Sequence, residues 1–109
     1  MTSRVLQWGL SVASACVLVA CGASPYPHAT AADVAVAQKQ RAGVTLQDLE
    51  QGRSLYLSRC GSCHQVIDPK SVAPSKWPHE VEEMRERAKL DTQDVDQIVL
   101  YLVTIASRG

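Results

Sequence analysis

A short run in the middle of the chain combines two thiols and an imidazole: Cys60-Gly61-Ser62-Cys63-His64. This spacing is the pattern that attaches a c-type haem. Each thiol can add to one vinyl group of the same porphyrin, and the histidine that follows can bind the iron. We therefore expect Cys60 and Cys63 to hold one haem covalently and His64 to be an axial ligand.

Two other uses of a Cys-x-x-Cys pair fit this sequence less well. A structural zinc site needs four protein ligands, and the sequence offers only His28 and His79 besides the motif, with no second cysteine pair downstream. A redox-active dithiol of the thioredoxin type lies within a βαβ pattern, and no segment here reads as a buried parallel strand. Both alternatives are weaker than haem attachment.

The composition agrees with a small domain built around a cofactor. The 109 residues allow about one domain. Phenylalanine is absent, so a chain this short has little apolar surface to bury by itself. A haem would fill that core. The formal net charge is zero, which argues against a general nucleic-acid-binding protein.

Residues 1–20 have the layout of a secretory signal peptide. Arg4 precedes an apolar stretch that Gln7, Gly9 and two serines interrupt, which is less regular than a membrane span. An uncleaved membrane anchor is the alternative. Export agrees with the motif, because bacteria join c-type haem to protein outside the cytoplasmic membrane.

The sequence LVAC over residues 18–21 resembles a lipobox, in which the cysteine receives diacylglycerol and becomes the first mature residue. Cys21 would then anchor the protein to a membrane without spanning it. Cys16 fits this role less well, because Ala13 stands where a bulky aliphatic residue is expected, and it would leave with the signal. No cysteine pair is then left for a disulfide. The alternative is that Cys21 is incidental to an ordinary cleavage site.

Residues 21–43, which begin with the lipidated cysteine, are rich in alanine, proline and small polar residues. They lack a sustained apolar face, which predicts a flexible linker. Residues 31–42 could form a loose helix, but one with little to bury. His28 lies in this segment, and we expect it to be solvated rather than a ligand.

The next segment reads as a capped helix. Thr45 can cap its first turn, Asp48 favours its positive end, and Val44 with Leu49 stand at the positions of a hydrophobic staple. We expect this helix to run toward Arg59.

A second capped helix closes the chain. Asp91 can cap it, with Asp94 in the first turn, and Leu90 with Val95 form another staple. An apolar stripe at helical spacing follows, made of Val95, Ile98, Val99, Leu102 and Ile105.

A glycine inside a helix costs about 1 kcal/mol relative to alanine, so Gly52 indicates the close approach of another helix. Class I cytochromes c cross their first and last helices at a glycine and an aromatic residue on one and an aliphatic residue and a tyrosine on the other. Gly52, Tyr56, Ile98 and Tyr101 match that pattern. With the haem motif, the chain therefore resembles a small class I c-type cytochrome. The resemblance implies an all-α, compact cytochrome c-like domain of three to four helices over residues 44–109. A plain helical pair would explain the stripes but not the motif.

Met84 is the candidate for the second axial ligand. A helix that begins at Trp77, with Pro78 in its first turn, places Met84 in one stripe with Trp77, Val81 and Ala88. In a haem domain we expect this methionine to bind the iron, whereas without haem it would be core filler. His79 is the rival ligand, but it lies roughly 140° around the helix from Met84. Met84 also follows His64 sooner than in longer class I proteins, which implies a trimmed fold.

Two further residues have weaker assignments. Pro69 could replace the family proline whose carbonyl orients the ligand imidazole, or simply form a turn. Trp77 could pack against the porphyrin edge or donate its indole N–H to a propionate, or it could only anchor its helix.

Together these features predict an electron carrier, not an enzyme, because no acid–base pair converges on a recognisable pocket. Axial ligation by histidine and methionine leaves no open iron position, and methionine favours Fe(II). The partner would be a membrane-bound redox protein on the periplasmic side, close to the lipid anchor. Two alternatives stay open: a haem domain that binds or senses a gas, and a haem subunit of a larger oxidase or dehydrogenase.

Overall fold

Four α-helices form the frame of the computed structural model, which describes residues 24–109. They are α1 (Ala31–Gln38), α2 (Leu46–Leu55), α3 (Trp77–Met84) and α4 (Thr92–Ala106). A π-helical turn, η1 (Tyr56–Cys60), continues α2, and two 3₁₀ turns, η2 (Pro69–Ser71) and η3 (Pro74–Lys76), precede α3. No strand occurs in this part of the chain, so the described fold is all-α, as predicted. The predicted signal peptide over residues 1–20, with Cys16, and the predicted lipidation of Cys21 lie outside the described residues.

The two predicted helix starts are confirmed. Thr45 caps α2, where its hydroxyl accepts a hydrogen bond from the Asp48 amide at 3.2 Å. Asp91 caps α4 in the same way, and its carboxylate accepts from the Asp94 amide at 2.8 Å. In both caps the acidic side chain in the first turn returns a bond to the cap, which completes a capping box.

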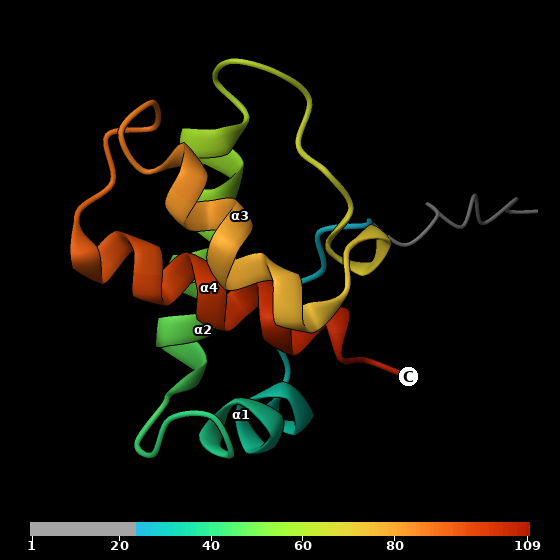
Figure 1. The fold of residues 1–109 in the computed structure, drawn as a ribbon. Coiled ribbons are helices and arrows are strands. Elements are labelled where there is room, and N and C mark those ends of the chain that lie inside the picture. The colour runs from blue at the N-terminus through green and yellow to red at the C-terminus, as the bar shows by residue number, and fades with distance from the viewer. Residues whose placement is uncertain (1–23) are drawn as a thin grey trace, which may run out of the picture.

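Helices α2 and α4 cross at Gly52 (Figure 1). A β-carbon on Gly52 would lie 2.1 Å from the backbone oxygen of Gln97 and 2.9 Å from the β-carbon of Tyr101. The glycine is therefore required by the contact between the helices, as its position in the sequence indicated. Ile98 and Tyr101 are fully buried at this crossing.

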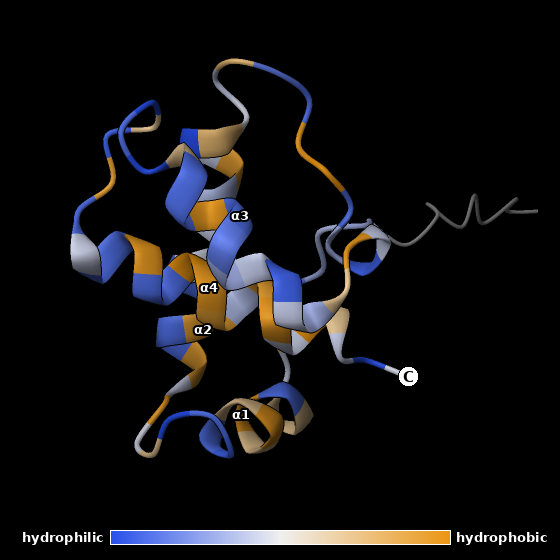
Figure 2. Cartoon of the chain, in the orientation of Figure 1, coloured by the Kyte–Doolittle hydropathy of each residue, from blue (hydrophilic) through white to orange (hydrophobic). Residues whose placement is uncertain are grey.

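The apolar side chains form two clusters. Figure 2 shows that apolar and polar residues alternate along the helices that supply them. The larger cluster lies between α2, α3 and α4; its most buried members are Tyr56, Trp77, Val81, Ile98, Tyr101, Leu102 and Ile105. The smaller cluster lies under α1 and contains Ala37, Val44, Leu49 and Leu100. Within residues 24–109, none of the helices has the length and apolar character needed to cross a membrane.

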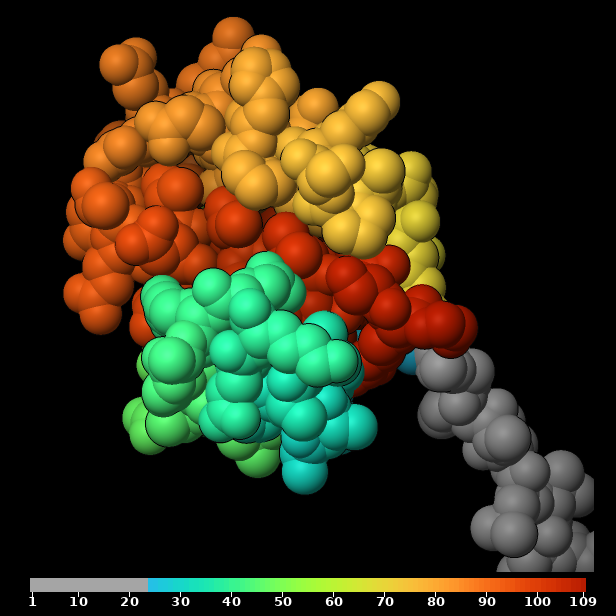
Figure 3. All heavy atoms as spheres, turned by 60° about the horizontal axis from the view of Figure 1, so that its bottom comes forward, coloured from blue at the N-terminus to red at the C-terminus, as the bar shows by residue number. Residues whose placement is uncertain are grey.

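The helix that the sequence allowed over residues 31–42 is present as α1, but residues 24–43 are packed on the domain and do not form a flexible linker. Thr30 caps α1, which lies beside the C-terminal end of the chain (Figure 3). Ala37 is fully buried, and Arg108 donates its Nε–H to the Asp33 carboxylate at 2.9 Å. Among the alanines of α1 only Ala37 is buried, and its small side chain lets the helix pack closely at that point. The ion pair with Arg108 then fixes the helix.

Residues 24–30, which we call the strap, connect α1 to the helix crossing. The Arg53 side chain donates to the Tyr26 carbonyl at 2.8 Å, and the Tyr101 hydroxyl donates to the Pro27 carbonyl at 2.9 Å. The Ala29 amide donates to Glu50 at 2.6 Å. These bonds hold the strap against α2 and α4. His28 is 74% exposed and pairs with Glu50, which agrees with a solvated histidine.

Helix α3 begins at Trp77, as predicted, but it ends at Met84. The next residues form turns that close at Lys89, whose φ of 54° lies in the left-handed region. The predicted helical stripe therefore stops short of Ala88, although the Ala88 amide still donates to the Met84 carbonyl at 2.9 Å.

Candidate functional site

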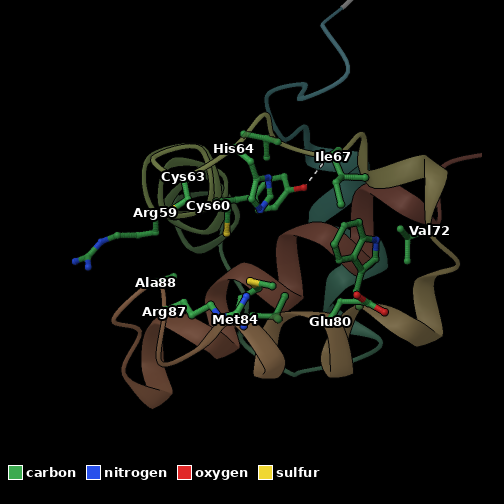
Figure 4. Close-up of a pocket in the computed structure, with 14 residues that line it drawn as sticks. Arg59, Cys60, Cys63, His64, Ile67, Val72, Glu80, Met84, Arg87 and Ala88 are labelled. Atoms are coloured by element: carbon green, nitrogen blue, oxygen red, sulfur yellow. Dashed lines mark hydrogen bonds between the residues drawn. The ribbon is translucent and has the colours of Figure 1, made fainter.

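A cleft opens between η1 with the loop that follows it and helix α3 (Figure 4). The cleft has a cavity volume of about 200 Å³ and is open to solvent at its mouth. This volume is smaller than the roughly 300–1,000 Å³ of typical small-molecule sites. The lining is mostly apolar and comprises Tyr56, Arg59, Cys60, Cys63, His64, Val66, Ile67, Val72, Trp77, Glu80, Val81, Met84, Arg87 and Ala88.

One wall carries both thiols of the motif. Cys60 is the last residue of η1 and is half-buried, whereas Cys63 is exposed. Burial raises the pKa of the Cys60 thiol. The turn between them is tight at Gly61, where a β-carbon would lie 2.4 Å from the Leu57 carbonyl oxygen. A π-helical turn is rare and often marks a functional site, and here it brings both cysteines to the cleft.

His64 lies at the same wall, and its imidazole is directed into the cleft (Figure 4). Its Nδ1 lies 2.9 Å from the carbonyl oxygen of Gln65. A carbonyl can only accept, so Nδ1 carries the proton. The lone pair of the neutral ring is then on Nε2, which is the atom left to bind a metal.

Met84 lies in the opposite wall, at the C-terminal end of α3. Its thioether sulfur is directed toward the side that holds Cys60 and His64 (Figure 4). His79 does not line the cleft; it is 74% exposed, and its Nε2 lies 3.3 Å from Glu83. The structure therefore places Met84, not His79, across from the motif.

Trp77 and Pro69 contact each other, which narrows the roles that the sequence allowed for them. The indole N–H of Trp77 donates to the Pro69 carbonyl at 3.0 Å in the interior. The indole is therefore engaged inside the protein and not available to a propionate. The Pro69 carbonyl holds Trp77 rather than His64, whose Nδ1 bonds to Gln65 instead. The Trp77 ring does line the cleft, where it could pack against a flat cofactor.

Sequence reasoning missed Tyr26. Its ring packs edge-to-face on Tyr56, with centroids 6.3 Å apart, and its hydroxyl donates to the Val66 carbonyl. Tyr56 packs in turn on Trp77 at 6.0 Å, and burial raises the pKa of its hydroxyl. No local signal marks Tyr26, because it lies between two prolines in a segment of linker-like composition. Its partners are thirty to forty residues away along the chain.

The charged residues at the cleft are two arginines and one glutamate. Arg59 donates to the Lys89 carbonyl at 3.4 Å and is directed away from the cleft (Figure 4). Arg87 and Glu80 lie on the α3 side. The remaining lining offers thiol, imidazole and thioether groups on an apolar surface.

Within residues 24–109, no group of three or more His, Cys, Asp and Glu side chains is placed to hold a metal ion. Searches of protein-family models, curated proteins and solved structures found no match to this chain. Any assignment of the cleft must therefore come from its own residues.

Proposed function

We propose that this chain binds one haem c covalently through Cys60 and Cys63 and transfers single electrons, with His64 and Met84 as the axial ligands. One observation carries the proposal: these four side chains line the two opposite walls of a single, mostly apolar cleft. A haem bound there would supply one-electron chemistry between Fe(III) and Fe(II).

Each residue has a distinct role in this proposal. Cys60 and Cys63 anchor and orient the group through thioether bonds. His64 offers Nε2, because its Nδ1–H is held by the Gln65 carbonyl. Met84 offers a neutral thioether, which favours Fe(II) and keeps water and other ligands from the sixth position. Val66, Val72 and Val81 line the walls and exclude water.

The scaffold supports a cytochrome c-like arrangement. The crossing at Gly52, with Ile98 and Tyr101 buried against it, has the residue types of the class I family. The haem motif begins at the last residue of η1, which continues α2. In this proposal the chain is an electron-transfer protein and not itself an enzyme. Its partner is a redox protein.

We further propose export and attachment of lipid to Cys21, so that the domain lies on the periplasmic side of a membrane. The strap makes this attachment short. Tyr26 is already held by Arg53, and the five residue steps from Cys21 to Tyr26 span at most about 17 Å. The domain would be held close to the membrane surface, which favours a membrane-bound donor or acceptor.

Optical spectra of the exported protein, with and without carbon monoxide, test the proposal. We expect a c-type reduced spectrum, a weak near-infrared sulfur-to-iron band that Met84→Ala abolishes, and no response to carbon monoxide in the wild type. Val81→Ala is the matched control, because it trims the same wall of the cleft without touching the sulfur; it should keep the band.

Two results would contradict the proposal in different ways. Absence of a haem spectrum would remove the cofactor altogether. A haem spectrum without the sulfur band, in a wild type that binds carbon monoxide readily, would show an open sixth position and make the chain a gas-binding haem protein.

A further inference from the structure

Three aromatic side chains donate hydrogen bonds to one short stretch of backbone between the motif and α3. The Tyr26 hydroxyl donates to the carbonyl of Val66, and the Tyr56 hydroxyl donates to that of Ile67 at 2.6 Å. The Trp77 indole donates to the carbonyl of Pro69 at 3.0 Å. Three of the four carbonyls over residues 66–69 are therefore held by aromatic donors.

The three rings also hold one another. Tyr56 is in the middle, edge-to-face with Tyr26 at an interplanar angle of 67° and with Trp77 at 78°. The backbone of Tyr26, which carries one of the two outer rings, is also held, because Arg53 donates to its carbonyl. We call the three residues Tyr26, Tyr56 and Trp77 the aromatic clamp.

Burial orders only part of this stretch. Pro69 is fully buried and Val66 is half-buried, whereas Ile67 is 48% exposed and Asp68 is exposed. His64 and Gln65, just before the stretch, are exposed as well, and the bond between them does not tie the loop to the rest of the fold. Ordering a residue costs about 1–2 kcal/mol of conformational entropy, so the exposed residues need contacts of another kind.

We propose that the aromatic clamp positions His64: by holding residues 66–69 it keeps the imidazole directed into the cleft. This inference rests on the proposed function, in which His64 is an axial ligand. It also makes the strap part of the site, because Tyr26 reaches the loop from the segment that precedes α1. None of the three residues touches the iron in this role; they act through the loop.

The substitution Tyr26→Phe tests the clamp, because it removes one hydroxyl and keeps the ring packed on Tyr56. Tyr101→Phe is the matched control. It also removes a tyrosine hydroxyl that bonds to a backbone carbonyl, that of Pro27 in the same strap, but this hydroxyl does not donate to residues 66–69. Tyr56→Phe gives a second variant within the clamp.

Two measurements distinguish positioning from general stability. The first is the set of NMR order parameters for the amides of residues 65–68, which should fall from near 0.85 toward below 0.6 in Tyr26→Phe and stay unchanged in Tyr101→Phe. Loss of the Tyr26 hydrogen bond should raise the fraction of molecules in which this loop is detached from the clamp about fivefold. The second is the reduction potential of the haem-loaded protein, which should shift in Tyr26→Phe and Tyr56→Phe but not in Tyr101→Phe.

Unchanged order parameters in both clamp variants, or equal changes in Tyr101→Phe, would overturn the inference. The proposed function fails separately, if the purified chain carries no haem. The order parameters of that haem-free chain would still decide whether the clamp holds the loop.

Discussion

The crossing of α2 and α4 and the loop held by the aromatic clamp are stabilised in different ways. The crossing is a buried contact: Ile98 and Tyr101 are fully buried, and Gly52 lets the two helix backbones approach closely. The loop is largely exposed and is held by hydrogen bonds from side chains that belong to the strap, η1 and α3. The helix crossing thus depends on close packing of side chains. The loop that forms one wall of the cleft depends on a few hydrogen bonds.

This difference predicts how each region responds to substitution. A change of shape at the crossing should weaken the whole domain, because the buried clusters share α4. Loss of one polar contact in the strap or loop should cost less and act more locally.

Gly52→Ala should have the largest effect. The added β-carbon would overlap the Gln97 carbonyl oxygen at 2.1 Å, and that oxygen is backbone, so the helices must separate. We expect a loss of about 3 kcal/mol or more in the free energy of unfolding. Urea denaturation measures it, with the exposed Ser54→Ala in the same helix as the control. A loss below about 1 kcal/mol would show that the crossing is not the rigid contact described.

Asp33→Asn tests the polar attachment of α1. The hydrogen bond from Arg108 lowers the pKa of Asp33 from its ordinary value of 3.8 to about 2. Because the folded pKa is the lower one, the carboxylate stabilises the fold fully above about pH 4, and that contribution disappears as the pH falls toward 2. It amounts to about 2 kcal/mol.

The measurement is the unfolding free energy as a function of pH. The difference between the wild type and Asp33→Asn should be constant above about pH 5 and shrink steadily toward pH 2. Asp96→Asn, which removes an exposed carboxylate from α4, should show no such trend. A difference independent of pH would mean that the ion pair with Arg108 does not hold α1.

Lys89→Gly should have the smallest effect, and in the opposite direction. Lys89 has a φ of 54° in the turn after α3, a conformation that costs a residue with a side chain about 1–2 kcal/mol. Glycine adopts it without strain but loses more entropy on folding, so we expect a net gain of about 0.5 kcal/mol. A modest rise in melting temperature would agree, and a fall would show that the lysine side chain contributes more than its backbone costs.

The crossing could be predicted from the sequence because its signals are local. Thr45 and Asp91 mark helix starts, and Gly52 with the spacing of Ile98 and Tyr101 marks the contact. The cleft could be predicted in part: the motif and the stripe through Trp77 and Met84 both point to it, and the structure brings these residues together. Haem binding itself stays a prediction.

The packing of the strap and of helix α1 on the domain could not be predicted, for a physical reason. Helix α1 is held by the buried Ala37 and by Arg108, which lies 75 residues away from Asp33 in the sequence. Tyr26 has the same difficulty, because its partner Val66 is 40 residues away. The composition of a segment indicates how much apolar surface it has. It does not indicate whether its polar groups have a hydrogen-bond partner far away in the sequence.

The proposed function depends first on covalent attachment of a haem to Cys60 and Cys63. The most direct measurement is to express the full chain with export in a bacterial host that attaches c-type haem, denature it, and extract it with acidified organic solvent. We expect the haem to stay with the wild-type polypeptide and to raise its mass by one haem. We expect no haem on the double variant Cys60→Ser, Cys63→Ser. A colourless chain, or haem that the solvent removes from the wild type, would contradict covalent attachment.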